Sequence, residues 1–240
     1  MPSNSDGVAI GDRMKRQYED RTDYALPRRT YTIVRVDGRA FHTLTKPLKR
    51  PFDYDFIAMM DSTALCMCRE MAGAQIAYVQ SDEISVLLTD FTTILTDAWF
   101  DASLRKMCSV SASIATAWFN LYWTENGHKP LATFDSRAFT IPDPIEVENY
   151  FIWRQQDWTR NSIQMVARHH YSHKQLHGKN VKDMQEMIHK KDDNWAQYHS
   201  RAKNGRFLWR EEEGWASQSD MIFTQNREEL RKRIPTIEIS

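Results

Sequence analysis

The sequence predicts an α+β fold, because its first ninety residues contain a strand, a helix and then two strands, in that order. Residues 32–36 are a β-branched run that stops at a turn-forming Asp-Gly pair. Residues 53–72 carry apolar side chains at helical spacing, with an Asp placed to cap the start and a Gly just after the end. Residues 75–79 and 84–88 are strand-like runs separated by a polar turn of hairpin length.

Acidic residues lie at the ends of these strands. Asp37 follows the first strand, and Asp82 and Glu83 lie at the tip of the hairpin. If the first and third strands pair, Asp37 and Asp82 meet at one edge of the sheet. An Asp-Gly turn or an acidic hairpin tip, taken alone, is more often structural. Two carboxylates held together repel, however, and oxygen ligands of this kind suit magnesium and phosphoryl or nucleotidyl transfer with two metals.

The rest of the chain alternates further helices and strands. In chain order we expect a charged helix over residues 11–23 that packs on the protein, a helix over 98–122, a strand over 132–141, a long helix over 145–170, a short helix over 182–197 and an edge strand over 207–209. Pro142 and Pro144 mark a boundary, so residues 1–141 are predicted as a catalytic core and residues 142–240 as a mainly helical second part. The last thirty residues are predicted to be a loosely held tail.

Composition excludes several classes of protein. The 240 residues, 41% of them hydrophobic, are enough to bury a substantial core. No apolar run approaches the length of a membrane span, and the polar N-terminus lacks the apolar core of a secretory signal, so we expect no membrane partner and a cytoplasmic location. The three cysteines are expected to be reduced. Charge is balanced overall, at 32 basic and 32 acidic residues, but residues 154–210 are rich in Lys and Arg, which predicts an RNA-facing surface.

Two short motifs carry a family resemblance. Residues 37–42, Asp-Gly-Arg-Ala-Phe-His, and residues 80–83, Gln-Ser-Asp-Glu, resemble the active-site motifs of the tRNAHis guanylyltransferase family, whose members add nucleotides to RNA 5′ ends in the 3′-to-5′ direction. Later segments match in family order: residues 105–106, 111–113, 134–137, 153–157, 160–162 and 172–174. The resemblance covers roughly residues 14–210. It implies a polymerase-palm-like (ferredoxin-like) antiparallel sheet with packed helices and a mainly helical C-terminal extension.

The resemblance also implies roles for individual residues. Asp37 and Asp82 would bridge two magnesium ions, with the Gly38 carbonyl as a further ligand and Glu83 as a supporting catalytic acid. The predicted nucleotide-binding residues are Asp37, Gly38, Arg39, Ala40, Phe41, His42, Lys49, Ser81, Asp82, Lys106, Arg137 and Asn161. The predicted RNA-binding residues are Arg160, His173, Lys174, Lys179, Lys203 and Arg206. For the basic loop around Lys49, a solvated charged loop is the plain structural alternative.

One segment departs from the family pattern. Enzymes dedicated to tRNA-His carry a His-Ile-Asn run where this chain has Thr159-Arg160-Asn161, which looks instead like the guanylyltransferase-like relatives associated with repair of truncated tRNA 5′ ends. The resemblance therefore implies tRNA, GTP, ATP or other nucleoside triphosphates as partners, and assembly as a tetramer. A nucleotidyl cyclase of the same architecture and a non-catalytic RNA-binding protein stay open as alternatives.

Overall fold

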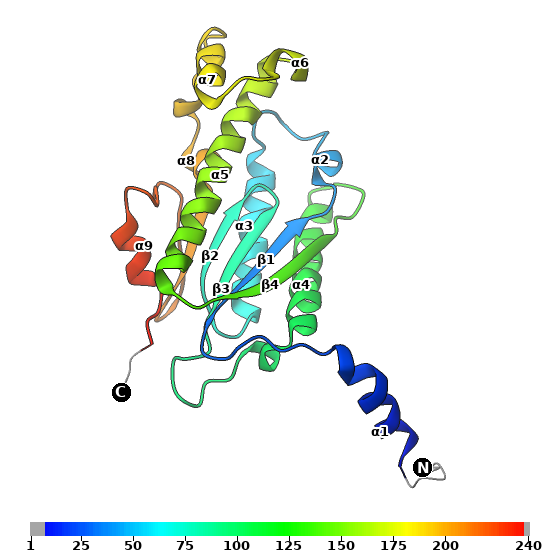
Figure 1. Cartoon of the computed structure of the whole chain (residues 1–240). Helices are drawn as coiled ribbons and strands as arrows, with labels where there is room; N and C mark the ends of the chain where they lie inside the picture. The colour runs from blue at the N-terminus through cyan, green and yellow to red at the C-terminus, as the bar shows by residue number, and fades with distance from the viewer. Residues whose placement is uncertain (1–7, 238–240) are drawn as a thin grey trace.

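The structure, a computed structural model, describes residues 8–237. Six antiparallel strands form one sheet in the order β4-β1-β3-β2-β5-β6 (Figure 1). The strands are β1 Tyr31–Gly38, β2 Ala74–Gln80, β3 Glu83–Leu88, β4 Phe134–Ile141, β5 Arg206–Glu211 and β6 Gly214–Gln218. The α-helices are α1 Ile10–Met14, α2 Phe41–Leu44, α3 Tyr54–Glu70, α4 Leu104–Glu125, α5 Pro144–His170, α6 His173–Leu176, α7 Val181–His189, α8 Ser200–Lys203 and α9 Arg227–Arg233. The predicted α+β class with an antiparallel sheet is confirmed.

The order β1, α3, β2, β3 confirms the predicted strand, helix, strand, strand. The side chain of Asp53 caps α3 by accepting a hydrogen bond from the Phe56 amide at 2.9 Å. Gly73 follows the helix with φ +81°, and a Cβ there would lie 2.4 Å from the Thr89 carbonyl oxygen, so glycine is required. The β2–β3 turn is tighter than predicted, because only Ser81 and Asp82 lie between the strands.

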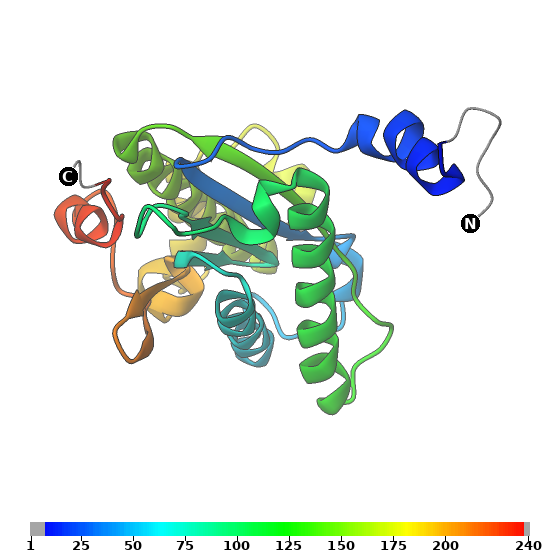
Figure 2. The same ribbon diagram turned by 90° about the horizontal axis from the view of Figure 1, so that it is seen from below.

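The two faces of the sheet bury different layers. Val34 and Val36 of β1 face the core formed with α3 and α4. Ile33, one residue away on the alternating strand, joins the opposite core with α5 and α9. Figure 2 shows α3 and α4 on one side of the sheet and α5 on the other. Side chains at the α5 face of β1 and β3 therefore meet α5, which decides the surroundings of the functional site.

Several predicted element boundaries were wrong. The helix predicted over residues 98–122 begins at Leu104, because Phe100, Asp101 and Ala102 have positive φ in the short 3-10 segment before it. The predicted helix over residues 182–197 is α7, followed by a separate 3-10 turn, Trp195–Gln197.

The ends of the described chain also differ from expectation. The segment expected to pack near the N-terminus contains α1, buries no residue, and stands away from the body in both views (Figures 1 and 2). The expected C-terminal tail instead packs on the protein, since Phe223, Leu230 and Ile234 are buried. β5 is not an edge strand, because it lies between β2 and β6. The division at residue 141 stays a prediction, and both parts contribute strands to the sheet.

Candidate active site

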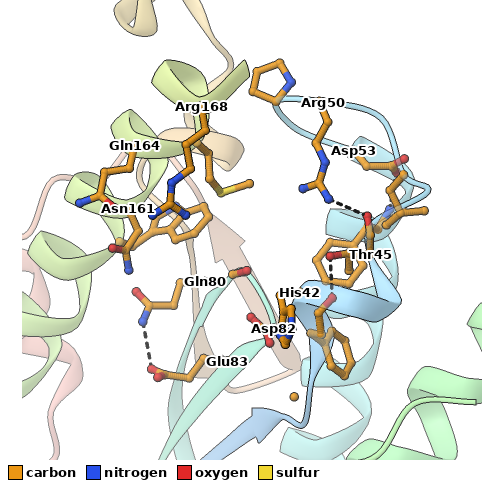
Figure 3. Close-up of a pocket in the computed structure, with 18 of the residues that line it drawn as sticks. His42, Thr45, Arg50, Asp53, Gln80, Asp82, Glu83, Asn161, Gln164 and Arg168 are labelled. Carbon is orange, nitrogen blue, oxygen red and sulfur yellow. Dashed lines mark hydrogen bonds between the residues drawn. The ribbon is translucent and has the colours of Figure 1, made fainter. Parts of the chain in front are cut away.

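A cavity of about 510 Å³ opens where β1 ends beside the β2–β3 turn (Figure 3). One wall is the segment that follows β1, the floor is the β2–β3 turn, and the opposite wall is α5. Of the residues predicted to bind metal or nucleotide or to act in catalysis, the cavity is lined by Asp37, Gly38, Ala40, Phe41, His42, Lys49, Ser81, Asp82, Glu83 and Asn161. Segments far apart in the sequence thus converge on one cavity.

Strand pairing brings Asp37 and Asp82 together. β1 and β3 pair antiparallel, with Asp37 opposite Glu83, so Asp82 lies one residue beyond the pair at the turn. The Gly38 amide donates a hydrogen bond to the Asp82 carbonyl oxygen at 3.1 Å, which fixes the two chain segments side by side. The convergence predicted from the order of the strands is therefore what the structure shows.

The carboxyls of Asp37 and Asp82 are poorly neutralised. Burial is the main cause that raises the pKa of Asp82 to about 6, and the nearby charge of Asp37 contributes to this rise. Burial, together with the charge of Asp135, also raises the pKa of Asp37. Within residues 8–237, no Lys, Arg or His forms an ion pair with either carboxyl. Such a pair of oxygen ligands is stabilised by a bound cation.

The carboxyl of Glu83 has different surroundings. Arg154 of α5 donates from Nε to Oε1 and from Nη2 to Oε2, both at 2.8 Å. Gln80 Nε2 donates to Oε1 at 3.0 Å, and Arg35 Nε lies 3.8 Å from Oε2. Burial raises the pKa of Glu83, and the charges of Arg154 and Arg35 oppose this rise. Glu83 therefore ties β3 to α5, and its oxygens are turned to protein cations.

Comparison with known proteins identifies the family. Residues 11–142, more than half of the chain, match the family model described as tRNAHis guanylyltransferase. The chain belongs to the tRNAHis guanylyltransferase family. Members of this family are nucleotidyltransferases, which agrees with two free carboxyls in a cavity that also contains cationic side chains.

Individual relatives extend the match. The tRNA(His) guanylyltransferase of Schizosaccharomyces pombe is 31% identical over 153 residues, which cover 62% of this chain and 56% of that enzyme. The chain thus spans little more than half the length of this curated guanylyltransferase. Two solved structures of bacterial tRNA(His) guanylyltransferase-like protein are similar over 95% of this chain and all of theirs: one in complex with ATP, at TM-score 0.89 and 43% identity, and one in complex with GTP, at TM-score 0.83 and 40% identity.

Three residues that the family resemblance assigned to the nucleotide lie outside this cavity. Arg39 is exposed and its amide bonds the Thr133 carbonyl. Lys106 is in the first turn of α4, with Nζ 6.0 Å from the centre of the Phe100 ring. Arg137, on β4, points its guanidinium at Asp135, 3.7 Å away. Their nucleotide-binding roles stay predictions.

The predicted RNA-binding residues divide into two groups. Arg160 on α5, and His173, Lys174 and Lys179 at or after α6, are exposed, and we call these four the RNA-facing surface. Lys203 is half-buried beside Trp195. Arg206 is only 3% exposed and its guanidinium binds Asp61 of α3. The prediction for Arg206 was wrong, because this arginine is an internal ion-pair partner that RNA cannot reach.

Sequence reasoning missed several residues that line the cavity. Arg154 and Asp157 lie in a segment already recognised as a family motif, but their side chains were given no role. Gln164 and Arg168 also line the cavity, three and seven residues after Asn161. Helical spacing was the signal that could have found them, because positions i, i+3 and i+7 share one face of a helix.

Among residues 8–237, no helix combines the length and the apolar character needed to span a bilayer. The same residues contain no group of three or more His, Cys, Asp or Glu side chains placed to hold a metal ion. A metal at this cavity would therefore rest on two carboxyls, a main-chain oxygen and water.

Proposed function

We propose that this protein adds GTP or other nucleoside triphosphates to the 5′ end of tRNA in the 3′-to-5′ direction, as a tRNA guanylyltransferase-like nucleotidyltransferase. The observation that carries the proposal is the meeting of Asp37 and Asp82, without cationic partners in the described chain, in a cavity whose walls also hold Lys49, Arg50 and Arg168. The bacterial proteins solved in complex with ATP and with GTP support a nucleotide in this cavity.

The donor set fits magnesium. Burial raises the pKa of both Asp37 and Asp82, so each carboxylate gains from a nearby positive charge. Magnesium prefers oxygen ligands and keeps several waters, so two carboxylates and the Gly38 carbonyl are a sufficient protein contribution. Two bound magnesium ions would neutralise the phosphates and lower the pKa of the attacking hydroxyl.

The reaction has two stages, which the residues of the cavity serve in different ways. In the first stage the RNA 5′-monophosphate attacks the α-phosphorus of a nucleoside triphosphate and pyrophosphate leaves. In the second stage the 3′-hydroxyl of an incoming nucleoside triphosphate attacks the activated 5′ phosphorus, and the nucleoside monophosphate leaves. Lys49, Arg50 and His42 line the wall after β1 and would donate to phosphate oxygens. Main-chain amides near Ala40 and Ser81 would orient the nucleotide.

Two features favour the repair of truncated tRNA 5′ ends as the role of this enzyme. Thr159-Arg160-Asn161 departs from the tRNA-His-dedicated pattern, and Asn161 lines the cavity. The RNA-facing surface begins on α5, the helix that forms one cavity wall. We therefore infer that truncated tRNAs are substrates. The tetramer and the cytoplasmic location stay predictions.

Two isosteric variants test the proposed function. We expect Asp37→Asn and Asp82→Asn to lower magnesium-dependent transfer of label from an α-labelled nucleoside triphosphate to a 5′-truncated tRNA by about a thousandfold or more, because each loses a metal-binding charge. Asp12→Asn is the matched control and should keep full transfer, because Asp12 is exposed and lies on α1, which Figure 1 shows well away from α2 and α5. Full transfer by either cavity variant contradicts the proposal, and a cyclic nucleotide made without RNA would favour a cyclase.

A further inference from the structure

Most cations that line the cavity already have partners within the protein. Arg154 is held by Glu83 through two hydrogen bonds of 2.8 Å. Lys49 Nζ lies 3.6 Å from Asp55, and Arg50 Nη2 donates to the Thr45 carbonyl at 2.9 Å. Arg168 differs from these three, because its guanidinium forms neither an ion pair nor a hydrogen bond with any of residues 8–237. Its five N–H donors remain free for an anion.

Arg168 is held on a rigid wall. Asn161, Gln164 and Arg168 lie on the face of α5 that borders the cavity, as Figure 3 shows. The opposite face of the helix is anchored, because the adjacent Val166 and Ala167 are fully buried. Arg168 therefore projects from a fixed backbone, and binding by this side chain requires no movement of the helix.

Arg168 also joins the cavity to the RNA-facing surface. Arg160 lies two turns earlier on the same helix, and His173 and Lys174 begin α6 just beyond its end. Arg50 lies on the opposite side of the cavity, on the segment after β1 (Figure 3). An RNA strand that follows the RNA-facing surface into the cavity meets Arg168 before it meets Asp37 and Asp82.

The proposed reaction requires two phosphate groups to be held at once, one on the nucleotide and one on the RNA. We propose that Arg168 binds the terminal 5′-phosphate of the RNA, while the opposite wall with Lys49 and Arg50 serves the nucleoside triphosphate. This inference rests on the proposed function. A guanidinium can donate two parallel hydrogen bonds to a phosphate, so Arg168 distinguishes a phosphorylated 5′ end from a 5′-hydroxyl end.

A binding cycle without nucleotide tests this assignment. The same 5′-truncated tRNA is prepared with a 5′-phosphate and with a 5′-hydroxyl, and the affinity of each is measured for the wild type and for Arg168→Ala. We expect the wild type to bind the phosphorylated tRNA about tenfold more tightly, and Arg168→Ala to reduce that preference to less than about twofold. Affinity for the 5′-hydroxyl tRNA should change little. Arg168→Lys should keep part of the preference, because a lysine supplies charge without the planar fork.

Controls separate this role from general charge and from the nucleotide site. Arg69→Ala removes an exposed arginine at the far end of α3, and it should keep the full wild-type preference. Affinity for magnesium GTP should be the same in the wild type and in Arg168→Ala. A preserved phosphate preference in Arg168→Ala overturns the proposal, and so does the absence of any preference in the wild type. Weakened GTP binding with an intact preference would assign Arg168 to the triphosphate instead.

The outcome is independent of the label-transfer assay. If the binding cycle gives the expected result but no variant or wild type transfers label, the proposed function fails and Arg168 remains a ligand of the RNA 5′ end. If label transfer is confirmed but Arg168→Ala keeps the wild-type preference for a 5′-phosphate, only the assignment of Arg168 fails. Because the Arg168 side chain is exposed, we expect the variants to fold as the wild type does.

Discussion

Asp82 and Glu83 are consecutive acidic residues, but the turn that holds Asp82 and the strand that holds Glu83 place the two carboxyls in different surroundings. Asp82 lies in the β2–β3 turn at the cavity floor and has no cationic partner in the described part of the chain. Glu83 is the first residue of β3, is 9% exposed, and is bound by Arg154 and Gln80. The Asp82 carboxyl in the turn is therefore available to a ligand, whereas the Glu83 carboxyl on the strand is already paired with Arg154.

The difference follows from the position at which the strand begins. A side chain at a strand position must point to one face or the other, and Glu83 points to the face covered by α5, opposite Asp37 on β1. Asp82, one residue earlier, is free of that constraint because it lies in the turn. One pair of adjacent carboxyls thus provides both a candidate metal ligand and an anchor for the helix that forms the opposite wall.

The largest loss of stability is expected when Arg154, the partner of Glu83, is replaced. Arg154→Met keeps the bulk of the side chain but leaves the buried Glu83 carboxylate without its main partner. We expect the free energy of unfolding to fall by about 3–5 kcal/mol, because an uncompensated buried charge is costly. Denaturant unfolding, followed by fluorescence, measures the loss.

The double variant Glu83→Met/Arg154→Met is the control for this prediction. Removing both charges should recover most of the lost stability, since a buried ion pair replaced by apolar groups of similar size is often nearly neutral. If Arg154→Met lowers the free energy of unfolding by less than about 1 kcal/mol, the Glu83 carboxylate does not depend on Arg154 as the structure indicates.

The candidate site was more predictable from the sequence than the outer parts of the fold. Local pattern gave β1, α3, β2 and β3, and the pairing of the first and third strands was enough to bring Asp37 and Asp82 together. The different role of Glu83 was not predictable from the hairpin, because it depends on Arg154, which is 71 residues away in the sequence.

Other errors share this physical cause. Arg206 follows a basic, glycine-containing turn and has the local character of a surface residue, but Asp61 on α3 draws it into the interior. The C-terminal segment is polar enough to suggest a tail, although β6 and Leu230 secure it to the sheet and the core. In each case a distant partner decides burial, and no local pattern contains that information.

Glu83→Gln removes the negative charge of the carboxyl that binds Arg154 and leaves Asp82 unchanged. We expect a stability loss of about 1–3 kcal/mol, because a charge-assisted hydrogen bond is replaced by a neutral one. Label transfer by the folded variant should stay within about tenfold of the wild type, in contrast to the much larger loss expected for Asp82→Asn. Equal inactivity of the two variants, with Glu83→Gln fully folded, would show that Glu83 acts directly on the reacting groups.

The smallest expected effect is the contribution of Asp82 to the pH dependence of stability. Its pKa is about 6 in the folded protein, against an ordinary value near 4 for an unfolded chain. Between about pH 4 and pH 6 this carboxyl therefore binds more protons in the folded state than in the unfolded state, so its contribution to the stability of the metal-free protein falls as pH rises through that interval. Because the Asp82 side chain is partly exposed at the cavity floor, solvent screening reduces the effect, and we expect a change of about 1 kcal/mol.

Comparing the wild type with Asp82→Asn isolates this term. Both proteins are unfolded by denaturant in the presence of a chelator at several pH values between about 4 and 7. The free energy of unfolding of the wild type, minus that of Asp82→Asn, should decrease as pH rises to about 6 and then stay constant. Identical pH profiles would mean that the cavity floor does not raise the pKa of Asp82. Added magnesium should abolish or reverse the decrease, because a bound cation favours the charged carboxylate that burial disfavours.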